Sequence, residues 1–140
     1  MTVTDFLLPV FVQVGLTFVL LAMTSISRLS NLNRGIVKAG DIALGQPNWP
    51  ERTTQLGNAF KNQLELPILF YVLIAFVLIT RVGDVLLLVL AWLFVLLRIA
   101  HAYIHATNNR VMLRARVYGG GMAVLIAMWI VFAVKVLSGI

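Results

Sequence analysis

The chain has 140 residues, of which 61 % are hydrophobic and only 11 % are charged, and its formal net charge is +6. A soluble domain is about half apolar and about a quarter charged, so this composition excludes a soluble protein and indicates one integral membrane domain over residues 1–140. The lack of cysteine excludes disulfides, thiolate metal sites and a cysteine nucleophile. Because the basic residues lie between apolar stretches, we expect no nucleic-acid partner.

The first apolar run predicts a membrane-spanning helix over residues 6–27. One face of this helix carries four polar side chains: Gln13, Thr17, Thr24 and Arg28. We expect this face to look inward, where hydrogen bonding between helices is its simplest role. Glycines and prolines predict a loop over residues 28–50. Arg34 in this loop is either a solvated charge or a contact to an anionic ligand at the membrane surface.

The second span is predicted over residues 53–80, and its entry is unusually polar. On a helical wheel, five polar residues fall within one narrow arc: Glu51, Gln55, Asn58, Asn62 and Glu65. A spanning helix needs about 20 residues, so the span must extend back to about residue 60 and draw Asn62 and Glu65 below the membrane surface. A carboxylate at that depth faces protein or a water-filled cavity and has a partner. Pro67 predicts a kink just past Glu65.

The third span is predicted over residues 84–106, and its polar residues match those of the second span in depth. With a tight turn at residues 81–83 and Asp84 as the cap of the next helix, neighbours at equal depth have residue numbers that sum to about 163. Three pairs satisfy this relation: Glu65 with Arg98, Asn62 with His101, and Asn58 with His105. We therefore expect the two polar stripes to face each other, with a buried ion pair between Glu65 and Arg98. The alternative is a coincidence among residues that merely lie near the interface.

The fourth span is predicted over residues 113–137, after a short basic loop. Lys and Arg are distributed unevenly over the two ends of the bundle. Two of them, Arg81 and Lys135, lie at one end, and nine lie at the other: Arg28, Arg34, Lys38, Arg52, Lys61, Arg98, Arg110, Arg114 and Arg116. The positive-inside rule then places both termini outside and the polar cluster at the cytoplasmic face of the cell membrane. The sequence predicts an all-α, up-down bundle of four membrane-spanning helices.

The predicted cluster combines a carboxylate, amides, two histidines and several arginines. The sequence has no phosphate-binding glycine loop, nucleophile elbow or HExxH motif. His101 and His105 could form a metal pair with Glu65 as a third ligand, but hydrogen-bonded histidines are more common, so we predict no metal. The surplus of arginine favours an anionic ligand at the membrane surface.

Several short stretches resemble signature segments of the MAPEG family, membrane-associated proteins in eicosanoid and glutathione metabolism. They are the Asn62, Glu65 and Pro67 pattern, Arg98 to His101, the loop from Arg34 to Gly40, and the pair Glu51 and Arg52. The resemblance covers nearly the whole chain. It implies a homotrimer of four-helix subunits with glutathione bound between neighbours. It also implies glutathione transferase or peroxidase activity toward lipophilic substrates, in those members that are enzymes.

The resemblance also implies roles for individual residues. Asn62, Glu65 and Arg98 match positions that contact glutathione, and Arg110 or Arg114 would stabilise its thiolate. The remaining residues of the predicted glutathione site are Arg28, Arg34, Asn58, His101 and His105. Two of these depart from the family pattern. Asn58 stands where catalytic relatives often carry an arginine, and His105 stands where a tyrosine is frequent.

Two functions from different classes therefore stay open. The first is an enzyme that generates a glutathione thiolate at the edge of the bilayer and acts on a lipophilic substrate. The second is a non-catalytic membrane scaffold or lipid-binding subunit of the same fold, in which the polar cluster only holds the helices together. Only the enzyme requires an open, basic, solvent-connected pocket at the cytoplasmic face.

Overall fold

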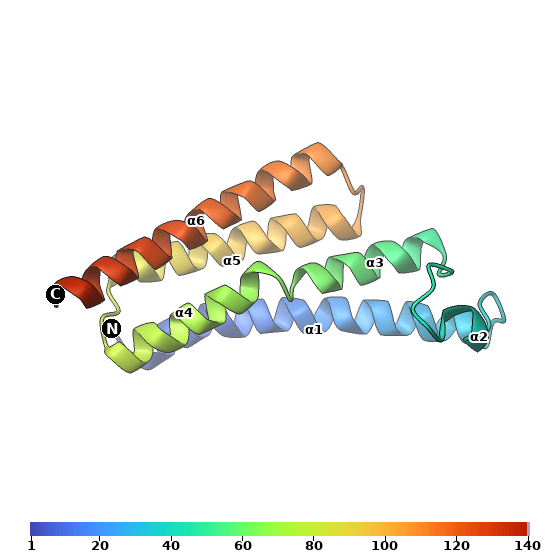
Figure 1. Cartoon of the computed structure of the whole chain (residues 1–140), viewed down its shortest axis with the longest axis horizontal. Helices are drawn as coiled ribbons and strands as arrows, with labels where there is room; N and C mark the ends of the chain where they lie inside the picture. The colour runs from blue at the N-terminus through green and yellow to red at the C-terminus, as the bar shows by residue number, and fades with distance from the viewer. Residues whose placement is uncertain (140) are drawn as a thin grey trace.

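The structure, a computed structural model, describes residues 1–139. Over this range the chain forms α1 (Val3–Asn33), α2 (Ala39–Ile42), α3 (Glu51–Asn62), α4 (Leu66–Thr80), α5 (Val85–Ala106) and α6 (Val111–Ser138). The long helices run up and down as four rods, with α3 and α4 making the second rod, and both termini lie at one end (Figure 1). Four segments are long and apolar enough to cross a membrane: Val3–Asn33, Glu51–Thr80, Val85–Ala106 and Val111–Ser138. The predicted all-α membrane bundle is confirmed.

At the end of the bundle that holds both chain termini, the local sequence determines where the helices begin. At the start of α1, the Thr2 backbone N–H donates to the Asp5 carboxylate at 2.7 Å, and the Asp5 N–H donates to the Thr2 hydroxyl at 3.3 Å. This reciprocal pair satisfies two of the backbone N–H groups that a helix start leaves free. At the turn before α5, the Asp84 carboxylate accepts from the Leu87 N–H at 2.9 Å, as predicted. Gly83 is required there, because a Cβ would lie 2.5 Å from the Phe6 ring.

The second rod is broken between α3 and α4, and the break decides where Glu65 lies. Pro67 has no N–H to donate to the carbonyl of Gln63, and its ring would clash with that carbonyl in a continuous helix. Pro67 instead falls in the first turn of α4, where its missing N–H costs little. Glu65 adopts φ −98° and ψ −105°, outside the helical range. The kink predicted just past Glu65 appears as this break, which begins earlier than predicted: α3 ends at Asn62 and α4 begins at Leu66.

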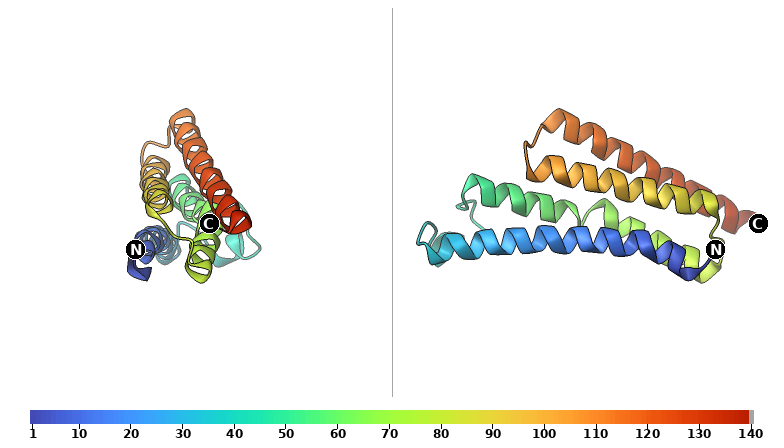
Figure 2. Two further views of the ribbon diagram at one scale, coloured as in Figure 1. Left: turned by 90° about the vertical axis from the view of Figure 1, so that its left-hand side faces the viewer. Right: turned by 180° about the vertical axis from the view of Figure 1, so that it is seen from behind.

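The hydrophobic core changes at the level of this break. Toward the termini it consists mainly of large side chains, with one alanine among them: Phe6, Phe70, Leu73, Ile74, Val77, Leu87, Ala91, Phe94, Val95, Leu125 and Met128. Phe70 and Phe94 stack here with ring centroids 4.8 Å apart. We call this part the termini half; α1, α4, α5 and α6 surround its core (Figure 2, left). Beyond the break, in what we call the cavity half, the core is smaller and rich in alanine: Leu20, Leu56, Ala59, Ala102 and Ala106.

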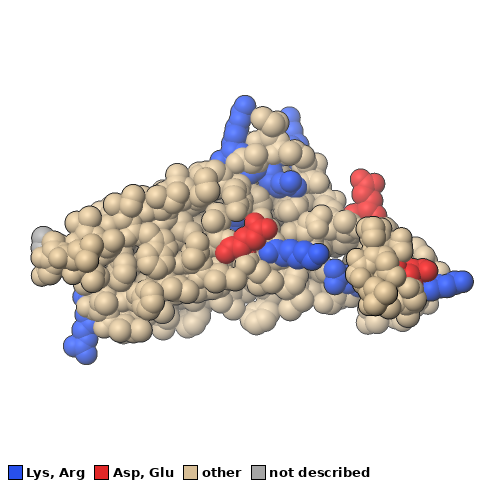
Figure 3. All heavy atoms as spheres, in the orientation of Figure 1, with Lys and Arg blue, Asp and Glu red and all other residues tan. Residues whose placement is uncertain are grey.

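The neighbours of each helix also change at the break. Beyond it, α3 packs against α1 and α5, whereas α4 packs mainly against α1 and α6. The polar stripe predicted to face the third span lies mainly on α3, and α3 does pack against α5. Charged side chains gather over the cavity half and are sparse over the termini half (Figure 3).

Candidate functional site

A cavity of about 270 Å³ opens in the cavity half, between the end of α3, the end of α5 and the start of α6. Eight residues line it: Asn62, Glu65, His101, His105, Val111, Arg114, Ala115 and Tyr118. We call it the Glu65 cavity. It brings together five of the residues predicted for the glutathione site or for thiolate stabilisation.

Arg98 does not itself line the Glu65 cavity but lies behind two residues that do, Asn62 and Tyr118. It is almost fully buried, with 1 % of its surface exposed. Its Nη2 donates to the Asn62 backbone carbonyl at 3.2 Å and also to the Asn62 side-chain oxygen. The guanidinium carbon lies 5.9 Å from the centre of the Tyr118 ring. Its Nε and Nη1 are buried and have no hydrogen-bond partner among the described residues. A buried guanidinium with free donors is costly, and an anion beside it would relieve that cost.

The carboxylate of Glu65 is held by neutral groups. One oxygen, Oε2, accepts from the Asn62 amide at 2.9 Å and from the Tyr118 hydroxyl at 3.4 Å. Within residues 1–139 no lysine or arginine forms an ion pair with it, and the Glu65 side chain is exposed. The predicted ion pair between Glu65 and Arg98 was wrong. The break after α3 turns Glu65 out of the helical register, so Asn62 takes its place beside Arg98.

The other predicted pairings between the second and third spans also shift. Asn62 contacts Arg98 rather than its predicted partner His101. Arg98 and His101 are about one helical turn apart along α5. Asn58 does not bond to His105; instead the Gln55 amide donates to the backbone carbonyls of His105 at 2.9 Å and Thr107 at 2.8 Å. The last carbonyls of a helix have no partner inside it, so Gln55 satisfies the end of α5 from α3.

The two histidine rings pack edge to face, and the His101 ring also packs at a tilt against Tyr118. The His101 and His105 ring centroids are 5.6 Å apart, and His101 lies 5.5 Å from the Tyr118 ring. The Nδ1 atom of each histidine is buried and has no partner in the described part of the chain. Across residues 1–139, no three His, Cys, Asp or Glu side chains lie close enough together to hold a metal ion.

The two arginines predicted to stabilise a thiolate lie in different places. Arg114, on the first turn of α6, lines the Glu65 cavity, and its Nη1 donates to the side-chain oxygen of Asn109. Arg110 caps the start of α6 and does not line this cavity. The cavity also contains Tyr118, which the sequence analysis missed. The available signal was its spacing: Tyr118 follows Arg114 by one helical turn and so shares its face of α6.

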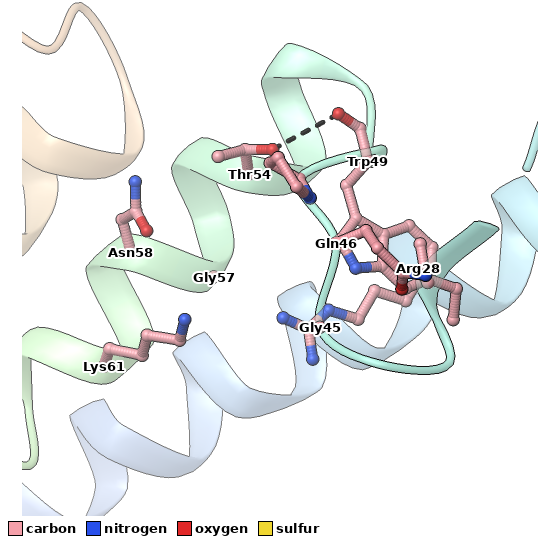
Figure 4. Close-up of a pocket in the computed structure, with 10 residues that line it drawn as sticks. Arg28, Gly45, Gln46, Trp49, Thr54, Gly57, Asn58 and Lys61 are labelled. Atoms are coloured by element: carbon pink, nitrogen blue, oxygen red, sulfur yellow. Dashed lines mark hydrogen bonds between the residues drawn. The ribbon is translucent and has the colours of Figure 1, made fainter.

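A second cavity, of about 430 Å³, lies between α1, the loop after α2 and α3 (Figure 4). We call it the Arg28 cavity. It is lined by Arg28, Ile42, Gly45, Gln46, Pro47, Trp49, Thr54, Gly57, Asn58 and Lys61, and it shares no residue with the Glu65 cavity. Arg28 and Asn58, both predicted to bind glutathione, lie here, whereas Arg34 lines neither cavity. Contact with glutathione stays a prediction for these residues, as it does for Arg110 and for the residues of the Glu65 cavity.

An apolar groove of about 570 Å³ runs between α4 and α6 on the membrane-facing surface. Its lining is almost entirely hydrophobic: Leu66, Leu69, Met122, Leu125, Ile126, Trp129, Ile130 and Ala133. Leu66 directly follows Glu65, and Met122 lies one turn beyond Tyr118. The groove therefore begins where the Glu65 cavity ends.

The sequence was also compared with known proteins. The model of the MAPEG family matches residues 6–134, which is nearly the whole chain. No curated protein and no solved structure matches it.

Proposed function

Because this chain belongs to the MAPEG family, we propose that its Glu65 cavity binds glutathione and presents the thiol to a lipophilic substrate. Family membership makes the chain a multi-pass membrane protein of a family active in glutathione and eicosanoid metabolism. The bound ligand and the reaction are the proposal. Glutathione offers carboxylates, an ammonium group and a thiol, and the cavity has a counterpart for each of them.

The observation that carries the proposal is the buried Arg98 guanidinium with two unpartnered donors. A buried arginine normally forms a two-pronged pair with a carboxylate, because its fork geometry matches both oxygens. Here the nearby carboxylate, Glu65, is bonded to Asn62 and Tyr118 instead. A carboxylate of glutathione would fill the vacant side of Arg98, and Glu65 would remain available for the ammonium group.

The shape of the site supports a subunit contact. Glu65 is exposed, yet it lies about 22 Å from Thr80 along the second rod, well inside a hydrocarbon layer of about 30 Å. A carboxylate facing lipid at that depth is strongly disfavoured. The cavity itself, at about 270 Å³, is at the small end for ligand sites. We propose that a neighbouring copy, in a homotrimer, completes the wall.

Arg114 is the residue we propose to stabilise the thiolate. A guanidinium near a thiol favours its deprotonated form, which is the nucleophile. His101 and His105, each with a free Nδ1, could accept the thiol proton. In a transfer reaction the sulfur forms a bond to an electrophilic carbon of the substrate, whose leaving group departs with the bonding electrons. The apolar groove would bring this lipophilic substrate from the bilayer to the cavity.

The uneven distribution of basic residues supports a location of the site at the cytoplasmic face, with both termini outside. Reporter fusions to the C-terminus and to the loop around Gly40 test this. A C-terminal reporter that is active only in the cytoplasm would reverse the orientation and move the site to the other side of the membrane.

A non-catalytic scaffold or lipid-binding subunit is the second candidate. It is favoured by the bonds from Arg98 to Asn62, which tie α5 to the end of α3 without any ligand. In that case the Glu65 cavity would only lock the helices, and the protein would not bind glutathione.

The proposed function is tested by glutathione binding to detergent-purified protein, with ultraviolet absorbance of the thiolate as the readout. Arg114→Gln should abolish the thiolate signal, whereas Arg116→Gln should leave it unchanged. Arg116 is the matched control because it lies two residues along the same helix, is exposed and does not line the cavity. Equal thiolate signals in both variants would contradict the role of Arg114, and no glutathione binding by the unmodified protein would favour the scaffold.

A further inference from the structure

The Arg28 cavity has the chemistry of an anion site. Two cationic side chains, Arg28 and Lys61, line it together with amide and hydroxyl groups from Gln46, Asn58 and Thr54. None of the described residues that line it carries a carboxylate. Asp41, the acidic residue of the preceding helix, is bonded to the Lys38 backbone N–H instead. Two positive charges without a negative one in a concave site attract anions.

Arg28 is held in position without having its charge neutralised. Its guanidinium carbon lies 5.4 Å from the centre of the Trp49 ring, a distance typical of cation–π stacking. Its Nε is buried and lacks a hydrogen-bond partner in the described residues. Gly57 makes room for it on α3, since a Cβ there would lie 3.2 Å from Nη2. In Figure 4 the side chains of Arg28, from α1, and Lys61, from α3, extend toward the same space.

The position of the cavity matches the headgroup layer of a membrane. Arg28 lies about 38 Å along α1 from Val3, more than the hydrocarbon thickness of about 30 Å. Trp49 is of the residue type that favours the membrane–water boundary. On the loop that closes the cavity, Leu44 is 90 % exposed, as expected for a side chain in contact with lipid.

We propose that the Arg28 cavity binds the phosphate of an anionic phospholipid in the leaflet at this end of the bundle. Arg28 and Lys61 contact the phosphate oxygens, and the amides of Gln46 and Asn58 hydrogen-bond to the headgroup. Ile42 and Pro47 form the apolar part of the wall, where the lipid leaves the cavity toward the bilayer. The occupied site would join α1, the loop after α2 and α3, so the local membrane composition would affect the stability of this end of the molecule.

This lipid site is independent of the proposed glutathione site. The two cavities share no lining residue. The Glu65 cavity contains a carboxylate that repels a phosphate, whereas the Arg28 cavity contains none. The failure of one proposal would therefore leave the other standing.

Native mass spectrometry of the full-length protein in detergent tests the proposal, with phosphatidylglycerol as the probe and phosphatidylcholine of the same acyl chains as the reference. We expect clear preference for phosphatidylglycerol. Arg28→Gln and Lys61→Gln should each weaken its binding by about tenfold, the usual effect of losing one charged hydrogen bond. Lys38→Gln is the matched control, since Lys38 is an exposed cation at the start of α2 that does not line the cavity, and it should change binding by less than about twofold. If Arg28→Gln does not fold, Lys61→Gln alone decides, because Lys61 is exposed.

Three results would overturn the proposal. The first is equal binding of the two lipids, or an equal loss of phosphatidylglycerol binding in Arg28→Gln, Lys61→Gln and Lys38→Gln. The second is binding of glycerol 3-phosphate as tight as that of phosphatidylglycerol, which would make the ligand a soluble phosphate. The third is displacement of phosphatidylglycerol by glutathione through Arg28, which would assign this cavity to glutathione as the sequence analysis predicted.

Discussion

The termini half and the cavity half are built on the same four rods but packed in different ways. Phe94 and Arg98 illustrate the difference, because they lie one turn apart on α5 and are both buried, at 0 % and 1 % exposed. Phe94 stacks on Phe70 in a core of large apolar side chains. Among the described residues Arg98 donates hydrogen bonds only to Asn62, and its Nε and Nη1 have no hydrogen-bond partner.

The boundary between the halves coincides with the break before Pro67. In the termini half, α4 is apolar all round and its core side chains pack closely. In the cavity half, α3 carries polar side chains that point into two cavities and onto the end of α5. The comparison teaches that the stability of this bundle comes mainly from one half, while the other half accepts unsatisfied polar groups that a ligand can use.

The largest expected effect is on the termini half. Phe94→Ala should lower the free energy of unfolding by about 3–5 kcal/mol, because it removes the stacked ring and leaves a cavity in the core. Glutathione binding at low temperature should be unchanged. The measurement is thermal unfolding in detergent. Leu93→Ala is the control, because Leu93 directly precedes Phe94 on α5 and its side chain is exposed. A loss for Phe94→Ala no greater than for Leu93→Ala would contradict the assignment of stability to this half.

The next effect is on the cavity half. Arg98→Leu should weaken glutathione binding by about a hundredfold, because two charged hydrogen bonds to the ligand are lost. The unfolding temperature should change by less than about 4 °C, since the variant also removes a poorly satisfied buried charge. Calorimetry of binding and thermal unfolding on the same samples give both values. An unfolding loss as large as that of Phe94→Ala would make Arg98 a structural residue and favour the scaffold function.

A smaller effect concerns the ion pair that links α5 and α6 at the termini end, between Lys135 and Asp84 at 2.8 Å. Burial raises the pKa of Asp84, but the hydrogen bonds from Lys135 and the Leu87 N–H lower the pKa by more, so it lies below its usual value. The pair therefore stabilises the fold above the unfolded-state pKa of about 3.9 and loses this contribution as the pH falls through the lower folded-state pKa. Asp84 is 38 % exposed, so solvent screening limits the effect to about 0.2–1 kcal/mol.

Asp84→Asn isolates this charge, because asparagine still caps α5. The variant should unfold at a slightly lower temperature than the unmodified protein at pH 7, and the difference should shrink as the pH falls below the unfolded-state pKa of about 3.9. Glutathione binding should not change, since the pair lies far from both cavities. A difference that grows as the pH falls would reverse the expected sign.

Sequence reasoning predicted the helices well and the contacts between them poorly. The apolar runs and the capping signal of Asp84 depend only on local sequence, so the spans and the turn before α5 could be predicted. The partner of Glu65 could not be predicted from the sequence. Pro67 permits either a kink or a complete break of the helix, and only the break turns Glu65 away from Arg98. The loop after α2, which forms one wall of the Arg28 cavity, carries no periodic pattern, so the division into two cavities was not predictable either.

The central claim is that glutathione occupies the Glu65 cavity and not the Arg28 cavity. The most direct test is the dissociation constant for glutathione of two single variants, Arg114→Gln and Arg28→Gln, each with one arginine removed from one cavity. We predict that Arg114→Gln weakens binding by about tenfold or more, as expected for the loss of a charged contact, while Arg28→Gln stays within about twofold of the unmodified protein. The opposite pattern, in which Arg28→Gln binds glutathione weakly and Arg114→Gln binds it as the unmodified protein does, would contradict the account.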